Sequence, residues 1–254
     1  MVQKLAHITG LCFDFDGVFY RISHVPNIHE ESDIIMAHSA VEILGDKIDF
    51  QQAKQLSHQS YKEYGDCLSS LMIWVNEKGI DEPDLRNKLF ESYHQKFYDK
   101  LLHLAPEIFV PETEIKTAFE KCKGHVANGI ATHGCVHNYA LPILNQKELS
   151  GYFTDHALFG LNDAGYNRKN HNTHLIQKCF NALNTSMAEG GFVEDTVANL
   201  KVAKENHPEL TTIYIHHGAP LPNQPTHVDY QFHNILELKN AIFTAKEERQ
   251  IILL

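Results

Sequence analysis

The sequence predicts an α/β fold: a parallel sheet flanked by helices, with an all-helical segment inserted after the first strand. Residues 7–16 form a continuous apolar run that contains aromatics, as expected of a strand buried on both faces. Between about 30 and 104, apolar residues recur only at helical spacing. From about 112 onward, strand-like and helix-like segments alternate, which implies a parallel sheet with right-handed crossovers.

The inserted segment contains three apolar stripes at helical spacing. The first comprises Ile34, His38, Val41, Leu44 and Ile48. The second comprises Ala53, Leu56, Tyr64, Cys67, Leu71 and Val75. The third comprises Leu85, Leu89, Tyr93, Phe97 and Leu101. We therefore expect a bundle of three or more helices forming a domain over residues 23–105, with 1–22 and 106–254 forming the α/β domain.

The elements after residue 105 follow from the same alternation. Helices are expected at 112–123, 135–146, 172–183, 196–206 and 235–247. Within the second of these, Pro142 either delays the start of the helix or kinks it. Strands are expected at 125–132, 156–160, 190–195, 211–217 and 228–232, and the proline-rich segment 218–225 is expected to be a loop.

Composition narrows the class of protein. The chain has 254 residues, is 43% hydrophobic and carries a net charge of −10 with no basic run, which argues against nucleic-acid or membrane partners. Five cysteines, no two of them two residues apart, suggest reduced thiols. We find no signal peptide and no apolar run of the ~20 residues that would cross a bilayer. We expect a cytoplasmic monomer or homodimer.

The stretch "LCFDFDGVFYR" places Asp14 and Asp16 where the first strand ends. Side chains two apart on a strand point the same way, so the two carboxylates crowd each other. Such a pair needs a cation, or one member must hold a proton. A hard divalent ion such as Mg²⁺ would resolve the repulsion, and a carboxylate there can also act as a nucleophile beside an acid–base partner. The alternative is a solvated strand end.

Three further segments place polar residues at the ends of predicted strands. Thr132 ends one strand, where its hydroxyl could hold a phosphate oxygen or cap a helix. Lys169 or Arg168 could neutralise a phosphate, or both could be solvated. Glu194 and Asp195 form a second acidic pair that could complete a metal site or interact with a helix dipole. Ligands of open α/β sheets bind at the edge where the strands end. Polar residues at several of these strand ends together therefore indicate a ligand site more strongly than any one of them alone.

In this order the four segments resemble the motifs of the haloacid dehalogenase superfamily, in its phosphatase branch. The stretch "DFDGVFY" resembles the first motif, Thr132 the second, Lys169 the third and "VEDTVANL" the fourth. The helical insertion directly after the first motif matches that family's cap. The resemblance covers nearly the whole chain and implies a Rossmannoid core with an inserted helical cap that closes over the site.

A narrower resemblance points to the pyrimidine 5′-nucleotidase subgroup. "SYKEYG" (60–65) is similar to a cap sequence of that subgroup, and "NILEL" (234–238) echoes its last helix. It implies a nucleoside monophosphate or another small phosphorylated metabolite as substrate. Tyr61 and Tyr64 could stack on a base or pack the bundle, with packing favoured for Tyr64.

The resemblance also implies a mechanism. Asp14 would attack the phosphorus of a phosphate monoester and form an aspartyl-phosphate. Asp16 would protonate the leaving oxygen and then activate water. Thr132 and Lys169 would hold the phosphoryl oxygens. Further substrate contacts would come from Gly17, His133 and Arg168.

For the metal, the resemblance implies Mg²⁺ held by Asp14, by the backbone carbonyl of Asp16 and by Asp195. Glu194 would be a ligand or support the ion from outside its ligand shell. Two residues depart from the family pattern: His133 follows the motif-two threonine, and Asn170 replaces the proline that usually follows the lysine. Because of these departures, the alternative that the protein kept the fold but lost activity, and is now a non-catalytic binding protein, stays open. A phosphomutase shares all these features, whereas a dehalogenase would not need Asp16.

Overall fold

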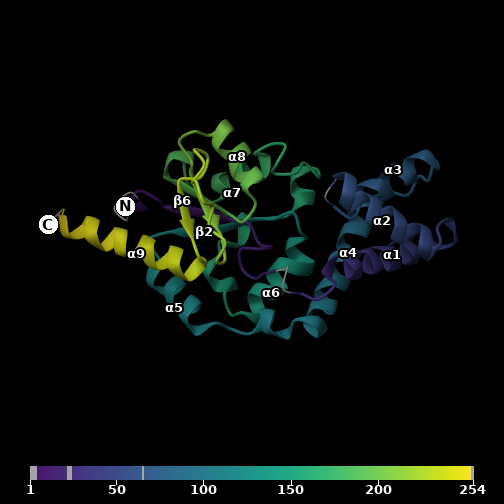
Figure 1. Cartoon of the computed structure of the whole chain (residues 1–254), viewed down its shortest axis with the longest axis horizontal. Coiled ribbons are helices and arrows are strands. Elements are labelled where there is room, and N and C mark those ends of the chain that lie inside the picture. The colour runs from purple at the N-terminus through teal and green to yellow at the C-terminus, as the bar shows by residue number, and fades with distance from the viewer. Residues whose placement is uncertain (1–4, 22–24, 65, 253–254) are drawn as a thin grey trace. The chain divides into compact units, whose positions relative to one another are not determined.

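The computed structural model describes residues 5–21, 25–64 and 66–252. The described residues of Met1–Arg21 and Phe109–Leu254 form one compact unit, and those of Ile22–Ile108 form a second. The first is an α/β unit and the second is entirely helical in its regular structure (Figure 1). Each unit is described in its own right below.

A six-stranded parallel sheet forms the centre of the α/β unit, as the sequence predicts. Its strands are β1 (Gly10–Phe13), β2 (Ala127–Ala131), β3 (Leu158–Phe159), β4 (Gly190–Glu194), β5 (Thr211–Ile215) and β6 (Tyr230–Phe232). Their order is β3-β2-β1-β4-β5-β6, and every neighbouring pair is parallel. The strands are shorter than predicted: Ile8, Val126 and Val228 lie before their strands, and Asp14 and Thr132 lie after theirs.

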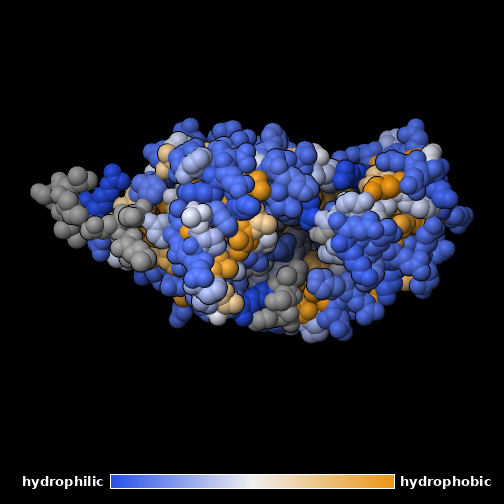
Figure 2. Space-filling model, turned by 45° about the horizontal axis from the view of Figure 1, so that its top comes forward, coloured by the Kyte–Doolittle hydropathy of each residue, from blue (hydrophilic) through white to orange (hydrophobic). Residues whose placement is uncertain are grey.

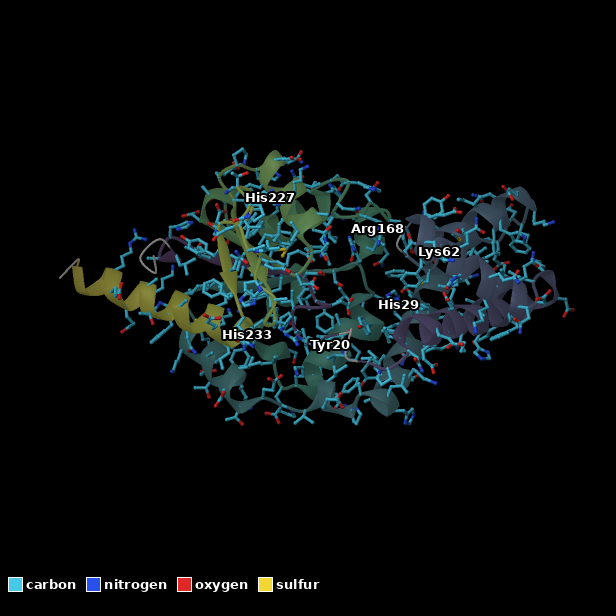
Figure 3. All side chains as sticks on the ribbon, in the orientation of Figure 1. Tyr20, His29, Lys62, Arg168, His227 and His233 are labelled. Carbon is cyan, nitrogen blue, oxygen red and sulfur yellow. The ribbon has the colours of Figure 1, made fainter. Side chains whose placement is uncertain are left out.

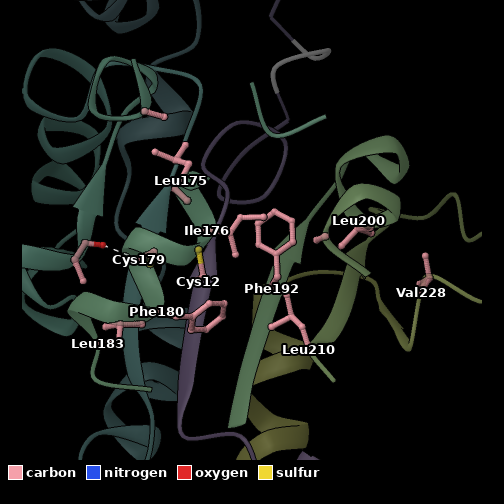
Figure 4. Packing of buried hydrophobic residues seen from close by; sticks show 14 residues of the cluster. Cys12, Leu175, Ile176, Cys179, Phe180, Leu183, Phe192, Leu200, Leu210 and Val228 are labelled. Carbon is pink, nitrogen blue, oxygen red and sulfur yellow. Dashed lines mark hydrogen bonds between the residues drawn. The ribbon is translucent and has the colours of Figure 1, made fainter. Parts of the chain in front are cut away.

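Helices cover both faces of this sheet. They are α5 (Thr113–Cys122), α6 (Leu141–Gln146), α7 (His174–Ala182), α8 (Val197–Asn206) and α9 (Ile235–Ile252). Cys12 of β1 packs in a cluster with residues of α7 and α8 (Figure 4). The next residue, Phe13, faces the opposite layer and contacts Phe119 of α5, with ring centroids 6.2 Å apart. Strand β1 is therefore buried on both sides, which explains its unbroken apolar sequence.

The order of the strands fixes where a ligand can bind. The chain adds β2 and β3 on one side of β1, then crosses back and adds β4, β5 and β6 on the other side. The switch point of the topology therefore lies between β1 and β4. In open α/β sheets, ligands bind beyond the carboxyl ends of the strands at this point. Asp14 follows β1 directly, and its backbone N–H donates to the Val193 carbonyl of β4 at 2.8 Å.

The segment 135–146 forms two kinds of helix. A five-residue π-helix, Val136–Ala140, leads directly into α6. Pro142 lies in the first turn of α6. The segment is therefore helical from Val136 onward, and it changes from a π-helix to an α-helix just before Pro142.

The helical unit contains α1 (Ile28–Leu44), α2 (Phe50–Tyr64), α3 (Ser69–Glu77) and α4 (Leu85–Leu104). The predicted stripe of α4 is confirmed: all five of its residues, from Leu85 to Leu101, are buried. The second stripe was predicted as one run but forms two helices. Asp66 lies at this break, and its Oδ1 accepts hydrogen bonds from the backbone N–H groups of Leu68 and Ser69, which starts α3.

The predicted stripe of α1 is confirmed only in part, since Leu44 and Ile48 are buried. His38 is exposed, whereas Ser32, Ser39 and Ala40 are buried. The hydroxyl of Ser32 is within hydrogen-bond distance of Tyr93 (2.6 Å), and that of Ser39 accepts from Ser92 (3.1 Å). Small residues let neighbouring helices approach closely, so the face of α1 cannot be recognised from large apolar residues alone.

On the face seen in Figure 2, hydrophilic residues dominate the surface of both units, with smaller apolar patches between them. Among the described residues, no helix combines the length and apolar character that crossing a membrane requires.

Candidate active site

A buried lysine joins two acidic residues from different strands. Nζ of Lys169 lies 2.7 Å from Oδ1 of Asp14 and 2.9 Å from Oε2 of Glu194, and it also donates to the Ala131 carbonyl at 3.0 Å. Lys169 and Glu194 are fully buried, and Asp14 is 7% exposed. Asp14 follows β1, Ala131 and Glu194 are the last residues of β2 and β4, and Lys169 lies between β3 and α7. The fold therefore brings together residues up to 180 positions apart.

The carboxylate of Glu194 is already fully hydrogen-bonded. Its Oε1 accepts from the backbone N–H groups of Asp195 (3.1 Å) and Thr196 (3.0 Å). Its Oε2 accepts from Lys169 and from Nδ2 of Asn199 (2.9 Å). Burial would raise the pKa of Glu194, but Lys169 and these hydrogen bonds outweigh it and lower the pKa to about 2. Glu194 therefore carries a permanent charge that orients both Lys169 and the loop that contains Asp195.

Gly17 makes room for Asp195. Its φ of +74° lies in the left-handed region, which favours glycine. A Cβ atom at this position would stand 1.9 Å from Oδ2 of Asp195. The Gly17 carbonyl accepts a hydrogen bond from Nε2 of His217, which follows β5. Gly17 thus lets the loop after β1 lie directly against the loop after β4, which brings Asp195 close to Asp14 and Glu194.

The acidic residues at this edge offer a donor set for a hard cation. Asp14, Glu194 and Asp195 each present a carboxylate oxygen, and these oxygens lie within 4.8 Å of one another. Burial and the charge of Glu194 raise the pKa of Asp14 well above its usual range and raise that of Asp195 to about 8. Lys169 offsets only part of this negative charge. A divalent ion with oxygen ligands fits the chemistry of the site, and Asp14 and Asp195 have the oxygens to hold it.

Asp16 has a different environment from Asp14. Its Oδ1 accepts two phenol hydrogen bonds, from Tyr20 at 2.5 Å and from Tyr139 at 2.6 Å. Burial raises the pKa of Asp16 to about 6, although the Tyr139 hydrogen bond acts in the opposite direction. A carboxyl group with this pKa can both donate and accept a proton near neutral pH. The two aspartates therefore have different surroundings: Asp14 contacts Lys169, whereas Asp16 is bonded to two phenol groups.

Thr132 lies immediately after β2 and is fully buried. Its backbone N–H donates to the Phe159 carbonyl at 3.0 Å, and its Oγ1 accepts from the backbone N–H of Gly134 at 3.0 Å. The oxygen accepts this hydrogen bond, so the hydroxyl O–H remains able to donate a hydrogen bond to another acceptor. Thr132 could therefore donate to a phosphoryl oxygen.

The two departures from the family pattern lie in segments that meet. Nε2 of His133 accepts a hydrogen bond from the backbone N–H of Lys169 at 2.9 Å. Burial is the main cause that lowers the pKa of His133 to about 3, and the positive charges of Lys169 and Arg168 lower it further. The ring therefore stays neutral and can accept this hydrogen bond. Arg168, labelled in Figure 3, is half-buried; it is Lys169 whose charged group contacts Asp14. Asn170 is exposed.

Tyr61 and Tyr64 both belong to α2 of the helical unit. The hydroxyl of Tyr61 lies 3.0 Å from that of Ser32, and burial raises the pKa of Tyr61 above its usual value. Tyr64 is 43% exposed, which contradicts the expectation that it packs the bundle. It is the last residue of α2, where the helix ends before the break at Asp66.

Sequence reasoning missed three residues around the acidic cluster: Tyr20, Tyr139 and His217. Tyr20, labelled in Figure 3, lies inside the quoted first motif, six residues after Asp14, and could have been considered. Tyr139 and His217 contact residues that are 123 and 200 positions away. No local pattern connects such residues, so only the fold could reveal them.

The fold is shared with solved structures of known proteins. A β-phosphoglucomutase from Clostridium difficile is 17% identical, with a TM-score of 0.59 over 96% of this chain and 99% of that one. A 2-haloacid dehalogenase from Pseudomonas syringae is 13% identical, with a TM-score of 0.55 over 92% and 98%. A haloacid dehalogenase superfamily hydrolase from Geobacter sulfurreducens is 16% identical, with a TM-score of 0.51 over 93% and 97%.

In sequence, neither a model of a protein family nor any curated protein matches the chain. The likeness is therefore one of architecture, and it extends over more than nine-tenths of each chain compared. The chain has the haloacid dehalogenase-like fold: a six-stranded parallel sheet flanked by helices, with an all-helical insertion after the first strand.

Proposed function

We propose that this protein is a Mg²⁺-dependent phosphate monoester hydrolase that works through an aspartyl-phosphate on Asp14. The observation that carries the proposal is the direct contact of Lys169 with Asp14 and Glu194 at the switch point of the sheet. A phosphate monoester brings negative charge to a carboxylate nucleophile. A lysine and a cation site beside that carboxylate offset this repulsion in the transition state.

In the first step, a carboxylate oxygen of Asp14 attacks phosphorus while the bond to the leaving oxygen breaks. Asp16 gives its proton to that oxygen, and an alcohol departs. In the second step, Asp16 takes a proton from water, and the water attacks the phosphorus of the aspartyl-phosphate. Inorganic phosphate leaves, and Asp14 is regenerated.

The remaining residues position the phosphoryl group. Nζ of Lys169 and the hydroxyl of Thr132 would donate to its oxygens. Asp14, Asp195 and the Asp16 carbonyl would hold Mg²⁺, with Glu194 supporting it, since the hydrogen-bonding capacity of Glu194 is otherwise used. The ion would supply positive charge at the phosphoryl oxygens.

For the substrate, we propose a small phosphorylated metabolite such as a nucleoside monophosphate. The similarity of residues 60–65 and 234–238 to the pyrimidine 5′-nucleotidase subgroup supports this choice. A negatively charged chain without basic runs fits a small-molecule substrate better than a nucleic acid.

A screen of nucleotides and sugar phosphates with Mg²⁺, read as inorganic phosphate, tests the proposal. We expect release from at least one class of monoester, and no release from Asp14→Asn or after chelation of the metal. If no monoester is hydrolysed although the protein binds Mg²⁺, that result favours a non-catalytic binding protein.

A phosphomutase is the second candidate, because a structure of similar fold is a β-phosphoglucomutase. Its first step would be the same transfer between a phosphate monoester and Asp14. The products separate the two functions: a hydrolase releases inorganic phosphate in proportion to substrate consumed, whereas a mutase forms an isomeric monoester.

A further inference from the structure

We propose that Tyr20 and Tyr139 are positioning residues that fix one oxygen of Asp16, so that its other oxygen transfers the proton to the leaving group. The inference rests on the proposed hydrolase function. By orienting the acid, the two tyrosines would speed the hydrolysis of esters with poor leaving groups, such as alkyl alcohols, which must be protonated as they leave.

Both hydroxyls reach the same atom. Tyr20 donates to Oδ1 of Asp16 at 2.5 Å, and Tyr139 donates to it at 2.6 Å. The two donors come from separate segments: Tyr20 from the turn after β1, and Tyr139 from the π-helix after β2. The terminal torsion of an aspartate is broad, and its two oxygens exchange easily. Two donors anchored in different segments fix the carboxyl plane and distinguish Oδ1 from Oδ2.

The tyrosines are themselves held in place by Phe15, which stands between the two aspartates in sequence. The ring of Phe15 meets Tyr20 edge-on at 5.9 Å and Tyr139 edge-on at 5.7 Å. Phe15 is fully buried, and Tyr20 and Tyr139 are 7% and 1% exposed. A Cβ at Gly134 would stand 3.0 Å from the Tyr139 ring, so there is little free space beside it. Neither phenol oxygen can move away from Asp16 without disturbing this packing.

The arrangement also suits the chemistry of proton transfer. As the bond between phosphorus and the leaving oxygen breaks, the bond between Oδ2 and its proton breaks and the leaving oxygen takes that proton. Negative charge then appears on the carboxylate of Asp16. Two phenol donors at Oδ1 stabilise this charge, because hydrogen bonds to ionised groups are stronger than those between neutral groups. The tyrosines therefore orient the acid and also favour the product of its proton loss.

Tyr20→Phe, Tyr139→Phe and the double variant remove the hydroxyls and retain the rings. Tyr152→Phe is the matched control, because the Tyr152 ring also packs on a buried phenylalanine, Phe119, at 5.7 Å but its hydroxyl is not bonded to Asp16. The measurement is kcat/KM for a series of monoesters ranging from p-nitrophenyl phosphate to alkyl phosphates. This parameter covers the step in which the leaving group is protonated.

General acid catalysis typically contributes about 10²–10⁴-fold, so we expect the double variant to lose about a hundredfold in kcat/KM for alkyl phosphates. The p-nitrophenolate ion leaves without a proton, so hydrolysis of its ester should change little. Each single variant keeps one donor and should show the same selective loss to a smaller degree, which preserves the test should the double variant fold poorly. The Tyr152→Phe control should match the wild type.

Equal losses for all esters, or no loss for any, would overturn the inference, since a purely structural role affects every substrate alike. Failure of the proposed function looks different. In that case the wild-type protein itself releases no phosphate from any ester, or Asp14→Asn retains the activity.

Discussion

The backbone N–H of Lys169 donates a hydrogen bond to the ring of His133 at 2.9 Å, which joins the loop after β2 to the segment that carries the lysine. In the sequence these two segments appeared as independent departures from a family pattern. In the structure, the histidine holds the backbone of Lys169 while the side chain of that lysine contacts Asp14. The unusual residue at position 133 therefore supports the site instead of weakening it.

His133→Leu should destabilise the protein by about 1–3 kcal/mol, because it leaves the Lys169 N–H without its acceptor. It should also lower the rate of phosphate release, since Lys169 loses its anchor. His133→Gln can present an acceptor oxygen and should recover part of both losses. Urea unfolding and a phosphate-release assay measure the two effects. A leucine variant with wild-type stability and rate would show that the hydrogen bond has no such role.

Lys169→Met should abolish turnover and destabilise the metal-free protein by about 3–5 kcal/mol, because it leaves buried carboxylates without their cation. Arg168→Met is the matched control, since Arg168 was the competing candidate for the phosphate contact. We expect it to retain most of the activity. The reverse result, with Lys169→Met active and Arg168→Met inactive, would assign the contact to Arg168.

Binding of Mg²⁺ should release protons, and its affinity should rise with pH. Without a metal, the pKa of Asp195 is raised to about 8 and that of Asp14 is raised well above its usual range, so protons compete with the cation. Calorimetry in two buffers with different ionisation enthalpies measures the number of protons released. Asp195→Asn should weaken binding, while Asp155→Asn, at an exposed position, should not. An affinity independent of pH between 6 and 9 would contradict this competition.

The stability of the protein should also fall in acid because of His94. This side chain is 8% exposed, and burial lowers its pKa to about 4. In the unfolded chain His94 takes up a proton near pH 6.5, whereas in the folded chain it does so only near pH 4. Its contribution to the free energy of unfolding is therefore fully present above pH 6.5 and is lost as the pH falls toward 4. This loss should reach about 3 kcal/mol at the lower pH.

Comparison with His94→Gln isolates this contribution. The variant lacks the titrating group, so its deficit relative to the wild type should shrink as pH falls from 6.5 to 4. Urea unfolding at a series of pH values measures the difference. A constant deficit across this range would show that His94 does not titrate differently in the folded and unfolded chains.

How much of the fold could be predicted depended on the size of the buried side chains. Helix α4 was recognisable because Leu85, Tyr93 and Phe97 mark its buried face with bulky apolar groups. The buried face of α1 was predicted only in part: Leu44 is buried as expected, but Ser32 and Ser39, which are small and polar, also lie on the side packed against its neighbours. Apolar periodicity does not detect such contacts.

The candidate site, too, was only partly predictable from the sequence. The acids after β1 and β4 were identified because strand ends of a parallel sheet share one edge, so local sequence sufficed to bring them together. The partners of Asp16 could not be found this way. Tyr139 is 123 residues from Asp16, and a tyrosine in a helical segment carries no sign of its hydrogen-bond partner.

Trapping the covalent intermediate tests the central claim most directly. The protein would be mixed with a hydrolysed monoester and Mg²⁺, quenched in acid within the first turnovers, reduced with borohydride and digested for mass spectrometry. Our account predicts that only the peptide containing Asp14 is modified, at Asp14, and that Asp14→Asn yields no modified peptide. Modification of a different residue, or full turnover with Asp14 unmodified at every quench time, would contradict it.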